Sequence, residues 1–145
     1  MKNKNLIIKE INKYFADKKN ISTIYLFGSF AKNFNRKDSD IDIAVLFKKN
    51  LGEHERFNLV LEFALELENI LGKKIDIIDI ENADPFFIHQ IMLDKIIVID
   101  NDTERRVSFE VDKRRTFFDM QPFYELYYTQ SIKRLKEKAI NGWKG

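Results

Sequence analysis

Apolar residues recur along this chain with two different periods, which predict strands and helices. Four short runs rich in β-branched and aromatic residues indicate strands, at residues 21–27, 40–47, 74–80 and 96–99. Four longer amphipathic or capped segments indicate helices, at residues 6–18, 53–71, 83–93 and 102–139, the last with an expected bend at Pro122. Because strands and helices alternate, we expect an α/β or α+β fold with a small mixed sheet flanked by helices.

The same pattern favours a single domain. With 145 residues, 44% of them hydrophobic, the chain is long enough to bury a core. No Pro/Ser-rich linker, low-complexity block or internal repeat divides it. We expect residues 1–101 to form the core of the fold. Residues 102–145 should form a helical tail that packs on the core or on a partner.

Composition excludes several classes of protein. A net charge of +2 is too small for a general nucleic-acid binder, so no nucleic acid is required as a partner. The absence of cysteine excludes disulfides and thiolate metal sites. The N-terminus shows no apolar signal-peptide region, and no stretch is long enough to span a membrane. We therefore expect a cytoplasmic protein without a membrane partner.

A Gly-Ser pair stands where a strand is expected to end and a helical turn to begin. Gly28 allows the backbone to approach a ligand without an intervening Cβ. Ser29 begins a turn whose free N–H groups and hydroxyl can face anionic oxygens. The loop that follows adds positive charge through Lys32 and Arg36. We expect these four residues to bind the phosphates of a nucleotide.

An Asp-x-Asp motif follows the Gly-Ser pair after ten residues. Side chains alternate along a strand, so Asp40 and Asp42 share one face while the isoleucines beside them face the core. Paired carboxylates suit hard divalent cations, and Mg²⁺ prefers a few carboxylates together with substrate phosphate oxygens. Two such ions about 4 Å apart stabilise both the attacking and the leaving oxygen of a phosphoryl-type displacement. We expect both aspartates to be catalytic metal ligands.

The arrangement Gly28-Ser29-x10-Asp40-x-Asp42 resembles the signature of the DNA-polymerase-β-type nucleotidyltransferase superfamily. From about residue 6 to residue 98 the chain is similar to the minimal nucleotidyltransferase branch, the antitoxin partners of HEPN-domain toxins. The resemblance implies the polymerase-β-type fold, with residues 1–101 as the nucleotidyltransferase core. It also implies Mg²⁺-dependent transfer of a nucleoside monophosphate from a nucleoside triphosphate, with release of pyrophosphate. Relatives often carry Arg after the Ser, and Phe30 here removes that phosphate ligand.

A third carboxylate is expected from the strand at residues 74–80. Asp76 shares a face with Ile78, and Asp79 shares the opposite face with Ile77, so the pattern alone leaves both acids open. The family resemblance favours Asp76, the first acid of the strand. Its expected roles are metal ligand and base that accepts the proton of the attacking hydroxyl.

The helical tail carries more apolar side chains than one helix can bury against a small sheet. They are Phe117, Phe118, Met120, Phe123, Tyr124, Leu126, Tyr127, Tyr128 and Leu135. In one interpretation this face packs on the core. In the other, part of it binds a partner or a second copy of the chain, because large exposed apolar patches mark interfaces. The pattern leaves a homo-oligomer open.

Nearly all residues belong to the nucleotide-binding core and one tail, so we expect another macromolecule to bring the acceptor. The resemblance implies transfer of AMP from ATP to a tyrosine hydroxyl of a HEPN ribonuclease toxin, which would make this chain an antitoxin. One alternative is an antitoxin that neutralises its toxin by binding alone, with a weak or vestigial site. Another is a nucleotidyltransferase that acts on RNA ends or on a small molecule.

Overall fold

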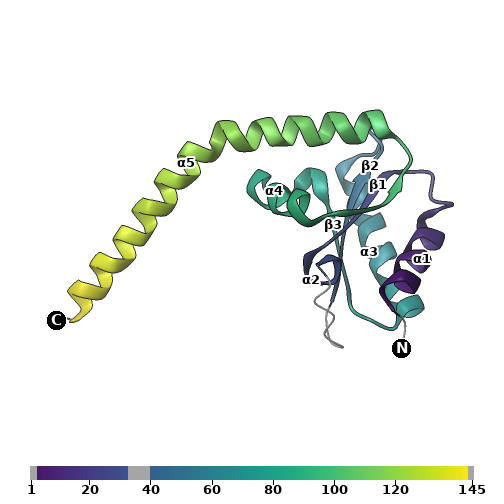
Figure 1. The fold of residues 1–145 in the computed structure, drawn as a ribbon, viewed down its shortest axis with the longest axis horizontal. Helices are drawn as coiled ribbons and strands as arrows, with labels where there is room; N and C mark the ends of the chain where they lie inside the picture. The colour runs from purple at the N-terminus through teal and green to yellow at the C-terminus, as the bar shows by residue number, and fades with distance from the viewer. Residues whose placement is uncertain (1–2, 33–39, 144–145) are drawn as a thin grey trace.

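The chain folds into a four-stranded mixed sheet with helices on both faces (Figure 1). The computed structural model describes residues 3–32 and 40–143. The elements in this part of the chain are α1 (Lys4–Phe15), β1 (Ile21–Phe27), α2 (Gly28–Ala31), β2 (Ile41–Phe47), α3 (Glu53–Leu71), β3 (Ile75–Asp79), the 3₁₀ turn η1 (Ile80–Asn82), α4 (Pro85–Asp94), β4 (Ile96–Asp100) and α5 (Thr103–Trp143). The expected class, a small mixed sheet flanked by helices and followed by a helical segment, is confirmed.

The strands pair in the order β3-β2-β1-β4. β1 lies antiparallel to both β2 and β4, and β2 lies parallel to β3. The predicted strand at residues 40–47 begins one residue later, because the backbone N–H that bonds the neighbouring strand is that of Ile41, which donates to the Lys74 carbonyl at 3.1 Å. The other predicted elements are present with small shifts at their ends.

Alternating side chains divide the apolar residues between two cores, one on each face of the sheet. On one face α1 and α3 cover a cluster in which the rings of Phe15 and Phe47 both contact Phe63. On the other face α4 and the first part of α5 cover a smaller cluster that includes Tyr25 and Phe109. Within the described part of the chain, no helix is long and apolar enough to cross a membrane.

α5 leaves the core after its first part and projects away from the sheet (Figure 1). It changes direction about half-way along, and Pro122 lies inside the helix. A proline in a helix interior removes one backbone hydrogen bond and bends the helix, so the expected bend is present. Phe117 is buried beside α4, where its ring stacks on His89. The exposed apolar residues of the distal half are Phe123, Leu126, Tyr127, Tyr128, Leu135 and Ile140.

A buried carboxylate attaches α5 to the sheet. Glu110 accepts a hydrogen bond from the Tyr25 hydroxyl at 3.3 Å and forms ion pairs with Lys95 and with Arg106, the latter at 2.9 Å. Arg106 also pairs with Asp100 at the end of β4, at 2.9 Å. Burial, together with the Glu110 charge, raises the pKa of Tyr25 above its usual range, so the phenol remains a hydrogen-bond donor at neutral pH.

We predict that Glu110→Ala lowers the free energy of unfolding by about 2–3 kcal/mol, because it leaves partly buried Lys95 without a counter-charge and the Tyr25 hydroxyl without its acceptor. Urea unfolding followed by circular dichroism measures this change. The control is Asp112→Ala, which removes an exposed carboxylate from the same helix and should alter stability by less than about 0.5 kcal/mol. Equal stability of the two variants would contradict an anchoring role for Glu110.

Candidate active site

The turn between β1 and α2 brings backbone against a carboxylate. Gly28 has φ +75°, in the left-handed region. A Cβ at this position would lie 2.2 Å from Oδ2 of Asp42, because Phe27 and Asp42 are direct partners across the β1–β2 pair. Both the backbone conformation and the space therefore require glycine here.

Two of the three predicted carboxylates come together in one cavity. Asp42 of β2 and Asp76 of β3 are direct partners in the parallel ladder, and both line a cavity of about 440 Å³. Burial raises the pKa of Asp42, and the neighbouring charges of Asp76 and then Asp40 raise it further. Among the described residues neither Asp42 nor Asp76 has a basic partner. Asp42 and Asp76 therefore place two adjacent negative charges at this end of the sheet.

Asp40 occupies a different position from the other two acids. It lies just before β2, its side chain is partly exposed, and Oδ2 is 3.9 Å from Nζ of Lys74. It is absent from the cavity lining, although its charge acts on Asp42. Over residues 3–32 and 40–143 the structure forms no cluster of three or more metal-ligating side chains. Metal coordination by Asp40 stays a prediction.

The two acids of β3 have different surroundings. Asp79 forms a largely buried ion pair with Arg56 of α3 at 2.7 Å and accepts a hydrogen bond from the Glu81 N–H at 3.3 Å. Asp76 is exposed to the cavity that contains Asp42. Asp79 thus holds α3 and η1 to the strand, whereas Asp76 faces the cavity, and its catalytic role stays a prediction.

The predicted phosphate-binding residues are placed in part. Ser29 is exposed at the start of α2 beside Gly28. Lys32 lines the cavity and pairs with Asp94 of α4 at 3.0 Å. Arg36 lies outside the described residues. Phe30 is 2% exposed and belongs to the core cluster under α1 and α3, so its side chain points away from the cavity.

The rest of the cavity wall comes from residues that the sequence analysis missed. Phe27 and Phe87 meet edge to face, with ring centroids 5.8 Å apart, and Ile78 of β3 with Gln90, Ile91 and Asp94 of α4 forms the remaining wall. The polar Gln90 in the largely apolar helix α4 was the available signal. The sequence did not show that Gln90 lies beside Asp42 and Asp76, because this depends on how α4 packs on one face of the sheet.

A family model described as "Polymerase beta, Nucleotidyltransferase" matches residues 9–104 of this chain. The chain belongs to the polymerase β nucleotidyltransferase family. The match contains the Gly28 turn and all three predicted acids of this nucleotidyltransferase.

Individual relatives are similar over the same region. A putative protein adenylyltransferase of Methanocaldococcus jannaschii is 40% identical over 72 residues, which are 50% of this chain and 70% of the relative. The protein adenylyltransferase MntA of Shewanella oneidensis is 32% identical over 90 residues, 62% of this chain and 60% of MntA.

Solved structures extend the likeness to most of the nucleotidyltransferase chain. A chain from a toxin–antitoxin crystal structure with AMP-PNP has a TM-score of 0.72 at 24% identity, covering 86% of this chain and 98% of that one. A structure of a tri-AMPylated Shewanella oneidensis HEPN toxin in complex with an MNT antitoxin gives 0.69 at 23% identity, covering 90% and 99%. At these identities the likenesses establish the fold, including a C-terminal segment beyond the family match.

The cavity suits the ligands that the family implies, which are a nucleotide substrate and usually a divalent cation. The acids that face it supply hard oxygen donors, and the neighbouring negative charges of Asp42 and Asp76 would attract a cation. Its volume falls within the range of sites for nucleotide-sized ligands. Asp42 and Asp76 are the residues that could hold a cation between the sheet and a phosphate.

We predict that Gly28→Ala disrupts the site, whereas Gly72→Ala costs only the strain of a left-handed alanine, about 1–2 kcal/mol. Gly72 has φ +65° but nothing within 4 Å of a Cβ, while Gly28 adds a collision with Asp42. The measurements are urea unfolding and the rise in melting temperature caused by Mg²⁺ with a non-hydrolysable ATP analogue. A Gly28→Ala protein that keeps the full ligand-induced rise would contradict the close packing of Gly28 on Asp42.

We predict that Asp42→Asn raises the melting temperature of the metal-free protein by about 2–4 °C at pH 7. A carboxyl whose pKa is higher in the folded state destabilises the fold above that pKa, and the effect disappears as the pH falls through it. The difference between variant and wild type should therefore shrink at acid pH. Differential scanning calorimetry in a chelator measures this effect, and a lower melting temperature for the variant at pH 7 would contradict it.

Proposed function

We propose that this nucleotidyltransferase transfers AMP from ATP to a hydroxyl of a protein, using Mg²⁺, and that the acceptor is a tyrosine of a HEPN ribonuclease toxin. The chain would then act as an antitoxin. The observation that carries the proposal is the shared cavity of Asp42 and Asp76 beside the Gly28 turn, in a chain whose relatives are named protein adenylyltransferases.

The described residues suit an in-line displacement at the α-phosphorus. Gly28 lets the turn pack against the Asp42 carboxylate without a Cβ in the way, and Lys32, which pairs with Asp94, lies at the cavity wall. Asp42 and Asp76 would hold Mg²⁺, with Asp40 as a further ligand. When bound, Mg²⁺ supplies the positive charge that offsets the developing charge on the phosphate oxygens.

In the step itself, Asp76 accepts the proton of the acceptor hydroxyl. The hydroxyl oxygen then forms a bond to the α-phosphorus, and the bond between that phosphorus and the bridging oxygen of the pyrophosphate breaks. AMP remains on the acceptor as a phosphodiester, and pyrophosphate leaves. Asp76 suits this role because it is exposed to the cavity, whereas Asp79 is committed to Arg56.

A protein acceptor is supported by two observations. Chains with this fold have been solved in toxin–antitoxin complexes, one of which contains a tri-AMPylated HEPN toxin. The distal half of α5 projects from the core with exposed apolar side chains, which a partner protein could cover.

We predict that the wild-type chain transfers label from α-³²P-ATP with Mg²⁺ to a HEPN protein from the same genome, and that Asp76→Asn slows transfer about 10²–10⁴-fold. The matched control is Asp79→Asn on the same strand. It should keep most of the transfer rate but lower the free energy of unfolding, because Arg56 loses its partner. Transfer at the wild-type rate by Asp76→Asn would contradict the assignment of Asp76 as the general base.

Neutralisation by binding alone is the second candidate function, and the exposed apolar half of α5 favours it. The same experiment separates the two. If wild type and Asp40→Ala/Asp42→Ala both leave the HEPN protein unlabelled and both suppress its toxicity, the acids are not needed and binding is sufficient. Label on the HEPN protein with wild type alone supports the adenylyltransferase.

A further inference from the structure

β3 is an edge strand whose open side is accessible. It pairs with β2 on one side, and within the described residues no strand pairs with it on the other. The Ile41 N–H donates to the Lys74 carbonyl, so even-numbered residues of this strand direct their backbone groups toward β2 and odd-numbered residues direct theirs outward. The outward N–H of Ile75 is bound by the Glu68 carboxylate at 3.2 Å. The N–H and C=O of Ile77 point to the open side.

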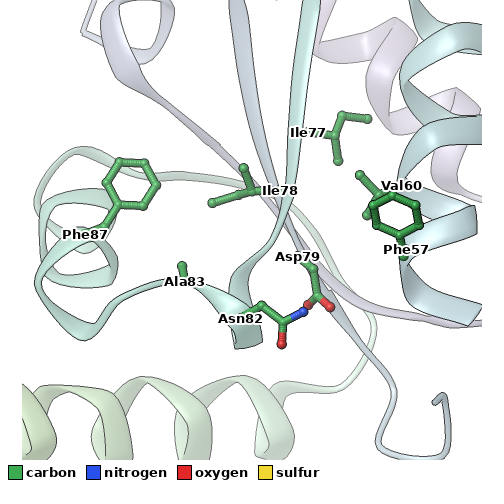
Figure 2. Close-up of a pocket in the computed structure, with 8 residues that line it drawn as sticks. All are labelled: Phe57, Val60, Ile77, Ile78, Asp79, Asn82, Ala83 and Phe87. Atoms are coloured by element: carbon green, nitrogen blue, oxygen red, sulfur yellow. The ribbon is translucent and has the colours of Figure 1, made fainter. Parts of the chain in front are cut away.

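A groove follows this open edge. Its volume is about 440 Å³, and aromatic residues stand on both sides of the strand (Figure 2). Phe57 and Val60 of α3 lie on the side of Ile77, and Phe87 of α4 lies on the side of Ile78. Phe57 is 61% exposed and Phe87 43% exposed, so both rings present apolar surface to solvent.

The groove is continuous with the carboxylate cavity. Ile78 and Phe87 line both spaces, and Asp76 of the cavity immediately precedes Ile77 of the groove on one strand. A transferase needs two adjoining binding sites, one for the donor nucleotide and one for the acceptor. The carboxylate cavity has the acids, Lys32 and an aromatic wall for the nucleotide, so we assign the adjoining groove to the acceptor.

The chemistry of the groove selects an extended polypeptide. Unpaired strand backbone offers a donor and an acceptor at the spacing of another strand, and apolar walls on the two faces suit its alternating side chains. Among the residues that the structure describes, the lining has no Lys or Arg to hold phosphates. The acid in this described lining, Asp79, is already bound to Arg56 and to the Glu81 N–H.

We propose that a segment of the acceptor protein docks in this groove in extended form, pairing with the open edge of β3. The docked segment presents its hydroxyl side chain to Asp76. This inference rests on the proposed function, because it assigns the place where the protein substrate of that same reaction binds. Recognition would then depend mainly on backbone pairing and on apolar side chains flanking the modified residue.

Phe57→Ala tests the groove without touching the carboxylate cavity, since Phe57 lines only the groove. With the HEPN protein as acceptor, we expect KM for the acceptor to rise about tenfold through loss of apolar contact. Affinity for Mg²⁺ with a non-hydrolysable ATP analogue should not change. The matched control is Leu65→Ala, an equally exposed apolar residue of α3 outside the groove, which should leave both quantities unchanged.

A photo-crosslinker at position 57, introduced as Phe57→p-benzoylphenylalanine, reports docking independently of activity. We expect it to join the HEPN protein within a few residues of the hydroxyl that receives AMP, in wild-type and in Asp76→Asn backgrounds. The crosslinker at position 65 should give no such product.

Three outcomes would overturn the groove assignment: an unchanged KM for Phe57→Ala, weaker nucleotide binding by that variant, or crosslinks remote from the modified residue. Weaker nucleotide binding would place the nucleoside in the groove instead. Failure of the proposed function is separately visible, as absence of label on the HEPN protein with the wild-type chain.

Discussion

The register of three neighbouring strands is the constraint on which the site depends. Phe27, Asp42 and Asp76 are successive partners across β1, β2 and β3, so the Gly28 turn and two carboxylates meet at one end of these strands. A shift of one residue would turn the acids toward α1 and α3 and expose the apolar side chains. The buried isoleucines between the acids thus hold the chemistry in place, and the glycine leaves room for the carboxylate that faces it.

This arrangement places Asp42 and Asp76 side by side, and neither has an ion-pair partner among the described residues. The raised pKa of Asp42 is the physical sign of that cost, which burial and the adjacent acids impose together. The two apolar cores on either face of the sheet offset it. A bound cation would replace the repulsion between the carboxylates by attraction to the cation. The folded protein should therefore be most stable with its ligands bound.

The five residues of β3 make three different kinds of contact. Asp76 faces the cavity, Asp79 ties the strand to α3, and the backbone of Ile77 faces an open groove. α5 adds an exposed apolar surface at a distance from β3. Its first part is locked to the sheet through Glu110 and Tyr25, while its distal half carries apolar side chains into solvent. Nucleotide binding and partner contact can therefore occupy different parts of one short chain.

Local order in the sequence was enough to predict the strands, the helices and the bend at Pro122, because periodicity and turn residues act over a few positions. The Gly28 turn and the Asp-x-Asp strand were visible for the same reason. The surroundings of Asp76 and Asp79 were not, since parity on a strand is symmetric until helices cover one face. Only the tertiary structure placed Arg56 beside Asp79, moved Asp40 to the margin of the cavity and brought Gln90 and Phe87 to its wall, because these contacts join segments far apart in the chain.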